Sequence, residues 1–477
     1  MKKYITGIVL LGGILIQSCS DAYEIEPQNS ITGEVAFLTV SDMELGLNGV
    51  YDIYDPEGVI AFSSIFTDDT KIGEDNAGQN AAFHNFLLDA GTGQASRIWN
   101  GMYNLINSAS RVIEASENIM PADNAEQARY NFVLGQCYAI RALAHLHLMT
   151  FYSTDYQPET PAVPYIDGVN VFEEPARNTV AEVSTGITAD LDRAENLIPD
   201  GFSDINYLTQ DGLTAIRARL ALYTGDYAAA EGFAGELIDN YELAGRDPYF
   251  FMFVGDTDVT EVIFKVKHIP NIDNGIGFEW FTNIGGSYLE VSNELVQIAD
   301  QDDGFDIRRF VVYTRQDAFG TEDTQERVNK YTGAPDGVYG VADVKIFRVS
   351  EMYLIRAEAR ARQDNLLGAA QDITALRNAR FSREDVATPY SDFDTALTAI
   401  LAERRLELCF EGHRYIDIKR TRDFTGTGIV RSAELNDCGP GTGTSNCVLA
   451  VGDYRFTLPI PATELDGNGV IQQNPGY

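Results

Sequence analysis

Three glutamates recur at every fourth position of the segment AERRLELCFEGHRYIDIKR, residues 402–420. On a helix, this spacing places Glu403, Glu407 and Glu411 along one face. Two carboxylates held at a fixed distance are the arrangement that a glycoside hydrolase needs. The segment also carries nearly as many cations as acids, which favours a satisfied ion-pair network over a carboxylate with a raised pKa. We therefore interpret it as a buried architectural clamp, remote from any ligand.

Other catalytic or metal-binding motifs are scarce in the sequence. It contains no GxSxG, no HExxH, no P-loop and no paired CxxC. His145 and His147 are two positions apart, so on a helix they face different directions and cannot chelate one metal. The acidic stretch DQDDGFD at 300–306 departs from a calcium loop, because its glycine falls one place early and no glutamate stands at the twelfth position. We predict no catalytic residue, no metal and no cofactor.

The formal net charge is −36, from 35 Lys and Arg against 71 Asp and Glu. Such a surface repels nucleic acid and anionic lipid. It also disfavours a polyanionic ligand, unless a local basic patch overrides the field of the whole chain. The 24 Tyr and 25 Phe supply many rings for a ligand that binds by stacking.

Residues 1–19, MKKYITGIVLLGGILIQSC, have the pattern of a bacterial export signal. The apolar stretch between the basic start and the cysteine is too short for a comfortable transmembrane helix. The ending LIQSC resembles the lipobox of bacterial lipoproteins, which implies cleavage before Cys19 and acylation of its thiol. The alternative is an ordinary secretory signal with an incidental cysteine. We expect a signal peptide over 1–18 and a lipidated polar tether over 19–40.

Two further cysteines flank the Gly-rich loop CGPGTGTSNC. Outside the cytoplasm, Cys438 and Cys447 can pair as a disulfide, and the sequence leaves this pairing open. Cys137 and Cys409 lie in apolar helical patterns, which indicates buried thiols.

Helical patterns dominate the rest of the chain. Apolar residues recur at helical spacing over 99–113, 125–152 and 179–198. Segments 212–240 and 352–380 each contain two helical stretches joined by a short turn and small residues, as in a tetratricopeptide repeat. The sequence predicts a mainly α fold, a right-handed solenoid of about four tetratricopeptide-like helix pairs, built from residues 41–241 and 346–424.

Residues 242–345 interrupt this pattern with Gly, Asn, Asp and aromatic residues and with short apolar runs. We expect a long, irregular, loop-rich insertion that contains short strands. A long insertion in a helical scaffold is usually functional. The C-terminal segment 425–477 is Pro-rich and is predicted to be extended and to pack back on the body.

Over essentially its whole length, the chain resembles the SusD-like (RagB/SusD) outer-membrane nutrient-binding lipoproteins of Bacteroidetes. The resemblance is carried by the lipobox, by WNGMYNLINSASRVI at 99–113, by FRVSEMYLIRAEARA at 347–361, by the 402–420 segment and by the ending LPIPATE…QNPGY. It implies a single body over 41–477 that is lipid-anchored to the outer membrane and exposed at the cell surface. It also implies a protein without enzymatic activity that binds a glycan, or in some cases peptides, as the lid of a partner SusC-like TonB-dependent transporter. A secreted glycoside hydrolase is the less favoured alternative.

Candidate ligand contacts concentrate in the insertion. A sugar ring offers a C–H face for stacking and hydroxyls around its rim, so aromatic and hydrogen-bonding side chains are expected at its site. The segment GFEWFTNIGGSY supplies the candidates Phe278, Trp280, Phe281, Asn283 and Tyr288. Trp280 is interpreted either as an exposed platform or as a core residue of the insertion.

Four further residues complete the candidate site. The family resemblance places the loop before Trp99 near the ligand face, although core packing is the favoured interpretation of that tryptophan. Asp68, Asp69 and Arg315 are weaker candidates for contacts to sugar hydroxyls.

Overall fold

The computed structural model describes residues 36–170, 172–269, 275–282, 286–302, 304–317, 319–333, 337–438 and 447–477. The predicted signal peptide, Cys19, most of the tether and Asn283 lie outside these ranges. In chain order, the helices of the scaffold are α3 (Val40–Asp52), α4 (Pro56–Ile65), α5 (Ala81–His84), α6 (Gly93–Ser116), α7 (Asn124–Tyr152), α8 (Val180–Glu195), α9 (Gln210–Thr224), α10 (Tyr227–Asn240), α14 (Val349–Arg362), α15 (Leu366–Arg380), α16 (Phe393–Leu408) and α17 (Arg414–Thr425).

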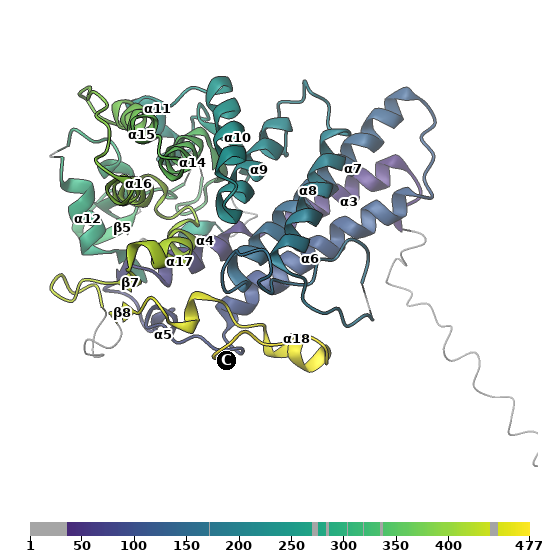
Figure 1. Cartoon of the computed structure of the whole chain (residues 1–477), viewed down its shortest axis with the longest axis horizontal. Coiled ribbons are helices and arrows are strands. Elements are labelled where there is room, and N and C mark those ends of the chain that lie inside the picture. The colour runs from purple at the N-terminus through teal and green to yellow at the C-terminus, as the bar shows by residue number, and fades with distance from the viewer. Residues whose placement is uncertain are drawn as a thin grey trace, which may run out of the picture.

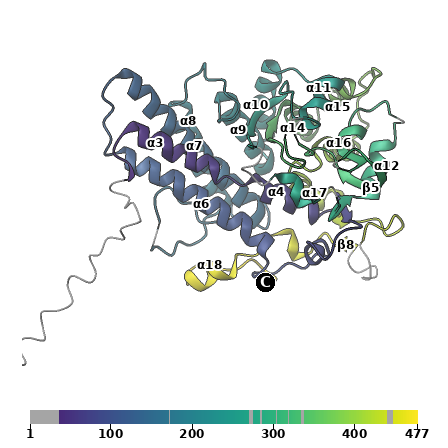
Figure 2. The same ribbon diagram turned by 180° about the vertical axis from the view of Figure 1, so that it is seen from behind.

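The scaffold is a series of packed helices, and the predicted mainly helical class is confirmed (Figure 1). Helix α6 packs on α7, α7 on α8, α9 on α10, α10 on α14 and α14 on α15. Seen from behind, α3 lies beside α6 and α7 at one end of this series (Figure 2). Small residues on the facing sides, such as Ala218, Ala230 and Ala234, are fully buried, which lets the helix axes approach closely.

The turn between α9 and α10 follows from local sequence chemistry. Gly225 adopts a left-handed conformation with φ of 82°, which a residue without a Cβ tolerates at no cost. Asp226 then caps α10 by accepting a hydrogen bond from the backbone N–H of Ala229. At the α14–α15 turn, Asn365 caps α15 in the same way through Gly368. Both predicted helix pairs are therefore present.

The insertion is more ordered than the sequence predicts. It contains the helices α11 (Arg246–Phe253), α12 (Asn293–Asp300) and α13 (Arg309–Val312), the short 3₁₀ helix η1 (Ile276–Glu279), and the strands β2 (Val262–Val266), β3 (Leu289–Val291), β4 (Tyr313–Gln316), β5 (Glu322–Val328) and β6 (Val344–Arg348). The expectation of irregular structure is wrong for the three helices, which are too short to show a sustained period. The expected short strands are present.

Antiparallel pairing ties the insertion to the scaffold. Strand β2 pairs with β6, so the two ends of the insertion lie side by side. Strand β3 pairs with β1 (Thr70–Ile72), which follows α4 in the scaffold. Strand β4 pairs with β5 within the insertion. The insertion is therefore anchored at its base and again near its middle.

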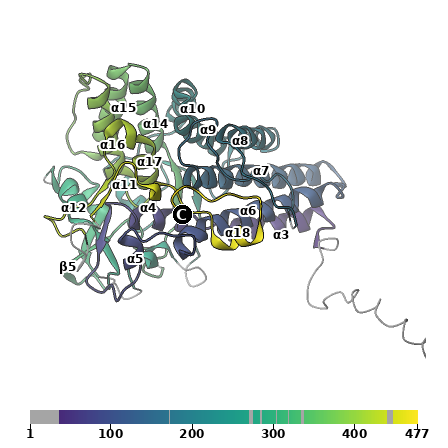
Figure 3. The same cartoon turned by 60° about the horizontal axis from the view of Figure 1, so that its bottom comes forward.

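The C-terminal segment packs back on the body as expected, and Figure 3 shows it running along α6 to the short helix α18 (Ala462–Gly467). Leu458 donates its backbone N–H to the carbonyl of Phe151 at 3.0 Å, and Ala462 donates to Ala90 at 2.9 Å. Before this stretch, the strands β7 (Ile429–Val430) and β8 (Val448–Leu449) pair, and Cys438 and Cys447 form a disulfide. No helix among the described residues is long and apolar enough to cross a membrane.

Candidate ligand-binding site

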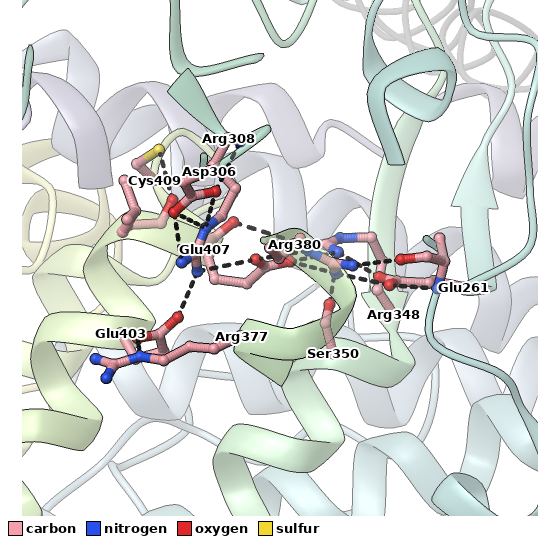
Figure 4. A network of polar contacts seen from close by, with 12 residues as sticks. Glu261, Asp306, Arg308, Arg348, Ser350, Arg377, Arg380, Glu403, Glu407 and Cys409 are labelled. Carbon is pink, nitrogen blue, oxygen red and sulfur yellow. Dashed lines mark hydrogen bonds and ion pairs between the residues drawn. The ribbon is translucent and has the colours of Figure 1, made fainter. Parts of the chain in front are cut away.

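The clamp, defined as residues 402–420 on α16, α17 and the turn between them, is a buried ion network as predicted (Figure 4). Glu407 is fully buried and lies at its centre. Its carboxylate accepts hydrogen bonds from Arg380 at 2.9 Å, from Arg348 at 3.1 Å and from Arg308 at 3.4 Å. Arg308 and Arg348 belong to the insertion and its closing strand, so the network joins the insertion to α16.

The two neighbouring glutamates of the stripe are paired in the same way. Glu403 accepts from Arg308 at 2.5 Å and from Arg377 at 2.6 Å. Glu411 accepts from Lys330 at 2.5 Å and from Arg348 at 2.8 Å. Burial raises the pKa of these carboxyls, but the adjacent cations outweigh it and hold each pKa below its usual range. Carboxylates that stay ionised and fully paired cannot serve as general acids.

The prediction that Asp68 and Asp69 contact the ligand is wrong, because both pair with arginines of the clamp. Asp68 and Asp69 are buried, and Arg414 donates to Asp68 at 2.7 and 2.8 Å. Arg405 lies 3.3 Å from an oxygen of each carboxylate. Neither aspartate can reach a ligand, because the arginines of the clamp occupy both. A void of about 30 Å³ beside Glu411 and His413 has room for no more than about one water.

The predicted aromatic platform is wrong in its main member. Trp280 is 0% exposed, and its ring stacks on Tyr331 with centroids 5.7 Å apart and meets the edge of Phe410. Phe281 is also fully buried, against Tyr339. Both are core residues of the insertion, which is the alternative that the sequence left open for Trp280.

Trp99 follows its favoured interpretation as a core residue. Its ring packs against Tyr103 and Tyr152, and its indole N–H lies 3.3 Å from a carboxylate oxygen of Glu464 on α18. Tyr288 is half-buried at the start of the β1–β3 pair, where its backbone N–H donates to the carbonyl of Trp280.

Phe278 is half-buried at a hollow of about 700 Å³, which we call the joint hollow. Its walls come from the α3–α4 turn, from α6, from the end of β2 and from η1, so it lies where scaffold and insertion meet. Besides Phe278, its lining includes the ionisable side chains of Asp55, Glu57, Arg97, His268 and Glu279.

A bridging arginine sets the geometry of the joint hollow. The Nε and Nη2 of Arg97 donate to the two oxygens of Asp55 at 2.6 and 2.8 Å, and its Nη1 donates to Glu279 at 2.6 Å. Burial alone would raise the pKa of Asp55. The hydrogen bonds from Arg97 outweigh that effect, so the pKa lies below its usual value. All three side chains remain between a fifth and a third exposed, so the remaining acceptor sites of the carboxylates face solvent.

A second pair closes the floor of the joint hollow. The Nε2 of His268 lies 2.6 Å from Glu57, whose pKa is raised by burial although the histidine opposes that shift. Fixed carboxylates beside a half-exposed ring can accept hydrogen bonds from ligand hydroxyls while the ring contacts an apolar face. Apart from Phe278, the sequence did not indicate these residues, because Arg97, Asp55 and Glu279 come together only in the fold.

Arg315 lies in a different place, at a hollow of about 680 Å³ that we call the insertion hollow. It is formed by residues of α11, α13, β4, β5 and the segment that follows β5. No group of three or more His, Cys, Asp or Glu side chains in the described ranges is arranged to hold a metal ion.

The chain has a helical-repeat scaffold with an open hollow beside an insertion, and its dense charge lies in a buried network. These features are typical of a scaffolded binding protein. Family models match two parts of the chain: the SusD family at residues 316–477, and a family described as starch-binding and associating with the outer membrane at residues 36–222. The chain belongs to the SusD-like family, which is a family of binding proteins and not of enzymes. The alternative of a secreted hydrolase is set aside.

Named relatives agree with this family. The chain is 24% identical over 538 aligned residues to SusD-like protein P2 of Formosa agariphila, covering 100% of both chains. It is 30% identical over 142 residues to the starch-binding protein SusD of Bacteroides thetaiotaomicron, covering 29% of this chain and 22% of that protein. A crystal structure of a SusD superfamily protein from B. thetaiotaomicron is similar in fold, with a TM-score of 0.77 and 21% identity over 92% of this chain and 100% of that one.

Proposed function

We propose that this protein binds an oligo- or polysaccharide in the joint hollow and delivers it to a SusC-like TonB-dependent transporter in the outer membrane, acting as the lid of that transporter. The observation that carries the ligand site is the joint hollow itself. It combines the partly buried ring of Phe278 with carboxylates that Arg97 holds in place. The description of the matched family as starch-binding supports the ligand class.

The site is tested by affinity electrophoresis of the purified body in gels that contain starch, laminarin, xylan, mannan or galactan. Phe278→Ala is expected to weaken retardation by the bound polysaccharide at least about tenfold, because the stacking face is lost. Phe172→Ala is the matched control, since Phe172 is 94% exposed and lies outside the joint hollow. Retardation that Phe278→Ala leaves unchanged would move the site elsewhere. Binding of peptides and of no polysaccharide would change the ligand class.

The anchor and the partner need separate experiments. We expect Cys19→Ala to release the protein from the outer-membrane fraction, because the acylated thiol is the proposed anchor. We expect the wild-type protein, solubilised from native membranes in mild detergent, to co-purify with a TonB-dependent barrel. A protein that stays in the membrane fraction after Cys19→Ala contradicts the anchor, and isolation without a barrel contradicts the lid role.

A further inference from the structure

The insertion hollow is as large as the joint hollow, and the proposed function does not use it. It presents an open aromatic face, because Phe310 is 43% exposed at its wall. The guanidinium of Arg309 lies 5.3 Å from the centre of that ring, and the guanidinium of Arg315 lies 5.2 Å from the centre of the Tyr313 ring. Two arginine–aromatic pairs thus line one hollow.

Both arginines are held in place yet keep free hydrogen-bond donors. The Nε of Arg309 donates to Asp300 at 2.6 Å, and the Nη2 of Arg315 donates to Glu326 at 2.7 Å. Asp300 also accepts from the Tyr313 hydroxyl at 2.9 Å, so the wall is braced. Arg309 also shares a hydrogen bond with the Tyr313 side chain, whereas the other guanidinium nitrogens of Arg315 make no hydrogen bond to the described residues.

A further polar group in the wall has no partner. The hydroxyl of Tyr339 is buried, and within the described part of the chain it makes no hydrogen bond. Because this hydroxyl is closed to solvent, the open guanidinium nitrogens of Arg315 are the polar groups that a sugar, rather than an apolar ligand, can satisfy.

The charges of the lining argue for an uncharged ligand. Asp317, Glu322 and Asp323 offset the two arginines, so the hollow has no net positive charge. The chain as a whole carries −36, which repels a polyanion. Hydroxyl groups both donate and accept, so they can pair with these carboxylates and with the open nitrogens of Arg315.

The two hollows are separate but lie close together. Tyr339 at the insertion hollow packs on Phe281, with ring centroids 4.8 Å apart. Phe281 also lies beside Gly340, and Gly340 in turn lies beside Phe278 of the joint hollow. Buried side chains of the insertion core therefore stand between them, and a residue can be changed at one hollow without touching the other.

We propose that the insertion hollow is a second carbohydrate-binding site, which takes an uncharged oligosaccharide independently of the joint hollow. The inference shares with the proposed function only the class of ligand. A second site would raise the avidity for a long polysaccharide without any new contact at the first.

The test is titration calorimetry with maltoheptaose, laminariheptaose and xylohexaose. The double variant Phe310→Ala/Arg315→Ala removes the ring and the donor. The matched control is Phe305→Ala/Arg383→Ala, because Phe305 is 48% exposed, Arg383 is 46% exposed, and their contact of 5.8 Å lies outside the insertion hollow. Phe278→Ala is titrated in parallel, and circular dichroism checks that every variant is folded.

We expect two bound molecules per protein in the wild type and in the control, and one in Phe310→Ala/Arg315→Ala. We also expect Phe278→Ala to retain one bound molecule, at the insertion hollow. Binding that is unchanged in Phe310→Ala/Arg315→Ala overturns the second site and leaves the proposed function standing. Binding lost in that variant and unchanged in Phe278→Ala keeps the insertion hollow and overturns the joint hollow. A wild type that binds none of the three probes overturns the second site, and the polysaccharide gels then decide the proposed function.

Discussion

The clamp and the joint hollow both bring arginines and carboxylates together across the scaffold and the insertion, but they differ in burial. In the clamp, Glu407 is shared among three arginines and is closed to solvent. In the joint hollow, Arg97 binds two carboxylates that remain partly open. The comparison teaches that exposed acceptor sites, and not the density of charge, distinguish a binding surface from an architectural network.

The largest effect is expected from pH, because four histidines are buried in the fold. Burial lowers the pKa of His84 and His147 to about 3 and of His145 and His413 to about 4, from an ordinary value of 6.5. A histidine with a lowered folded pKa stabilises the fold above pH 6.5 and loses that stability as the pH falls towards the folded pKa. Each contributes up to about 1.4 kcal/mol per pH unit.

Denaturant unfolding at pH 7 and at pH 5 measures this loss, and we expect a fall of several kcal/mol. The clamp carboxylates do not contribute in this window, because their unfolded pKa of 4.5 lies below it and their folded pKa lies lower still. Their stabilisation is lost only below about pH 4.5. Burial raises the pKa of Asp69 to about 6 and raises that of Glu57, so these two carboxyls act in the opposite direction in this window. Equal stability at pH 7 and pH 5 would mean that the histidine loss is no larger than this gain, and would contradict the prediction.

One glutamate from each region tests the comparison directly. Glu407→Ala should cost about 3–5 kcal/mol of unfolding free energy, because it leaves Arg308, Arg348 and Arg380 buried with a lost partner. Glu279→Ala, in the partly exposed pair with Arg97, should cost no more than about 1 kcal/mol. Chemical denaturation of both variants gives the two values. Similar losses would erase the distinction between a clamp and a binding surface.

Two aromatic residues that are two positions apart give a similar contrast within η1 and its end. Trp280→Ala should cost about 3–5 kcal/mol, because it empties a packed site between Tyr331 and Phe410. Phe278→Ala should cost less than Trp280→Ala, because its side chain is only partly buried, and should act on ligand binding instead. Thermal unfolding and affinity electrophoresis separate the two effects. The reverse pattern would restore Trp280 as the ligand platform.

The scaffold and the clamp could be predicted because their signals are local. Helix periods, the small residues of the Thr224–Asp226 turn and the spacing of the three glutamates all lie within short windows. The candidate site could not be predicted, because its partners are distant in sequence. Arg97 binds Glu279, 182 positions away, and nothing near either residue marks the pair.

The sequence did not decide whether Trp280 is exposed or buried, and the reason lies in the glycines beside it. Glycines beside an aromatic residue are compatible with an exposed loop. Instead, Gly275 and Gly277 let η1 approach the backbone at Gly340, where a Cβ on Gly275 would lie 2.0 Å from the Gly340 carbonyl oxygen. That close approach belongs to the packing that buries Trp280. A glycine beside an aromatic residue indicates close packing as readily as an open loop.

A smaller effect than that of Glu407→Ala or Trp280→Ala is expected at the rim of the clamp, where the disulfide lies. Asp437, next to Cys438, accepts hydrogen bonds from the backbone N–H groups of Asn293 and Glu294 at the start of α12, and Glu294 pairs with Arg405 at 3.0 Å. The bond closes a loop with a sequence separation of 9 residues, so its loss should cost about 2.5 kcal/mol at most.

Thermal unfolding with and without a reducing agent, on the wild type and on Cys438→Ser/Cys447→Ser, measures this contribution. We expect the reducing agent to lower the Tm of the wild type to that of the variant and to leave the variant unchanged. Because Glu407 shares no hydrogen bond or ion pair with Cys438, Cys447 or the described residues next to them, adding Glu407→Ala to the serine variant should give additive losses. Losses that exceed additivity would show that the rim and the centre of the clamp act as one cooperative unit, and the disulfide would then belong to the network.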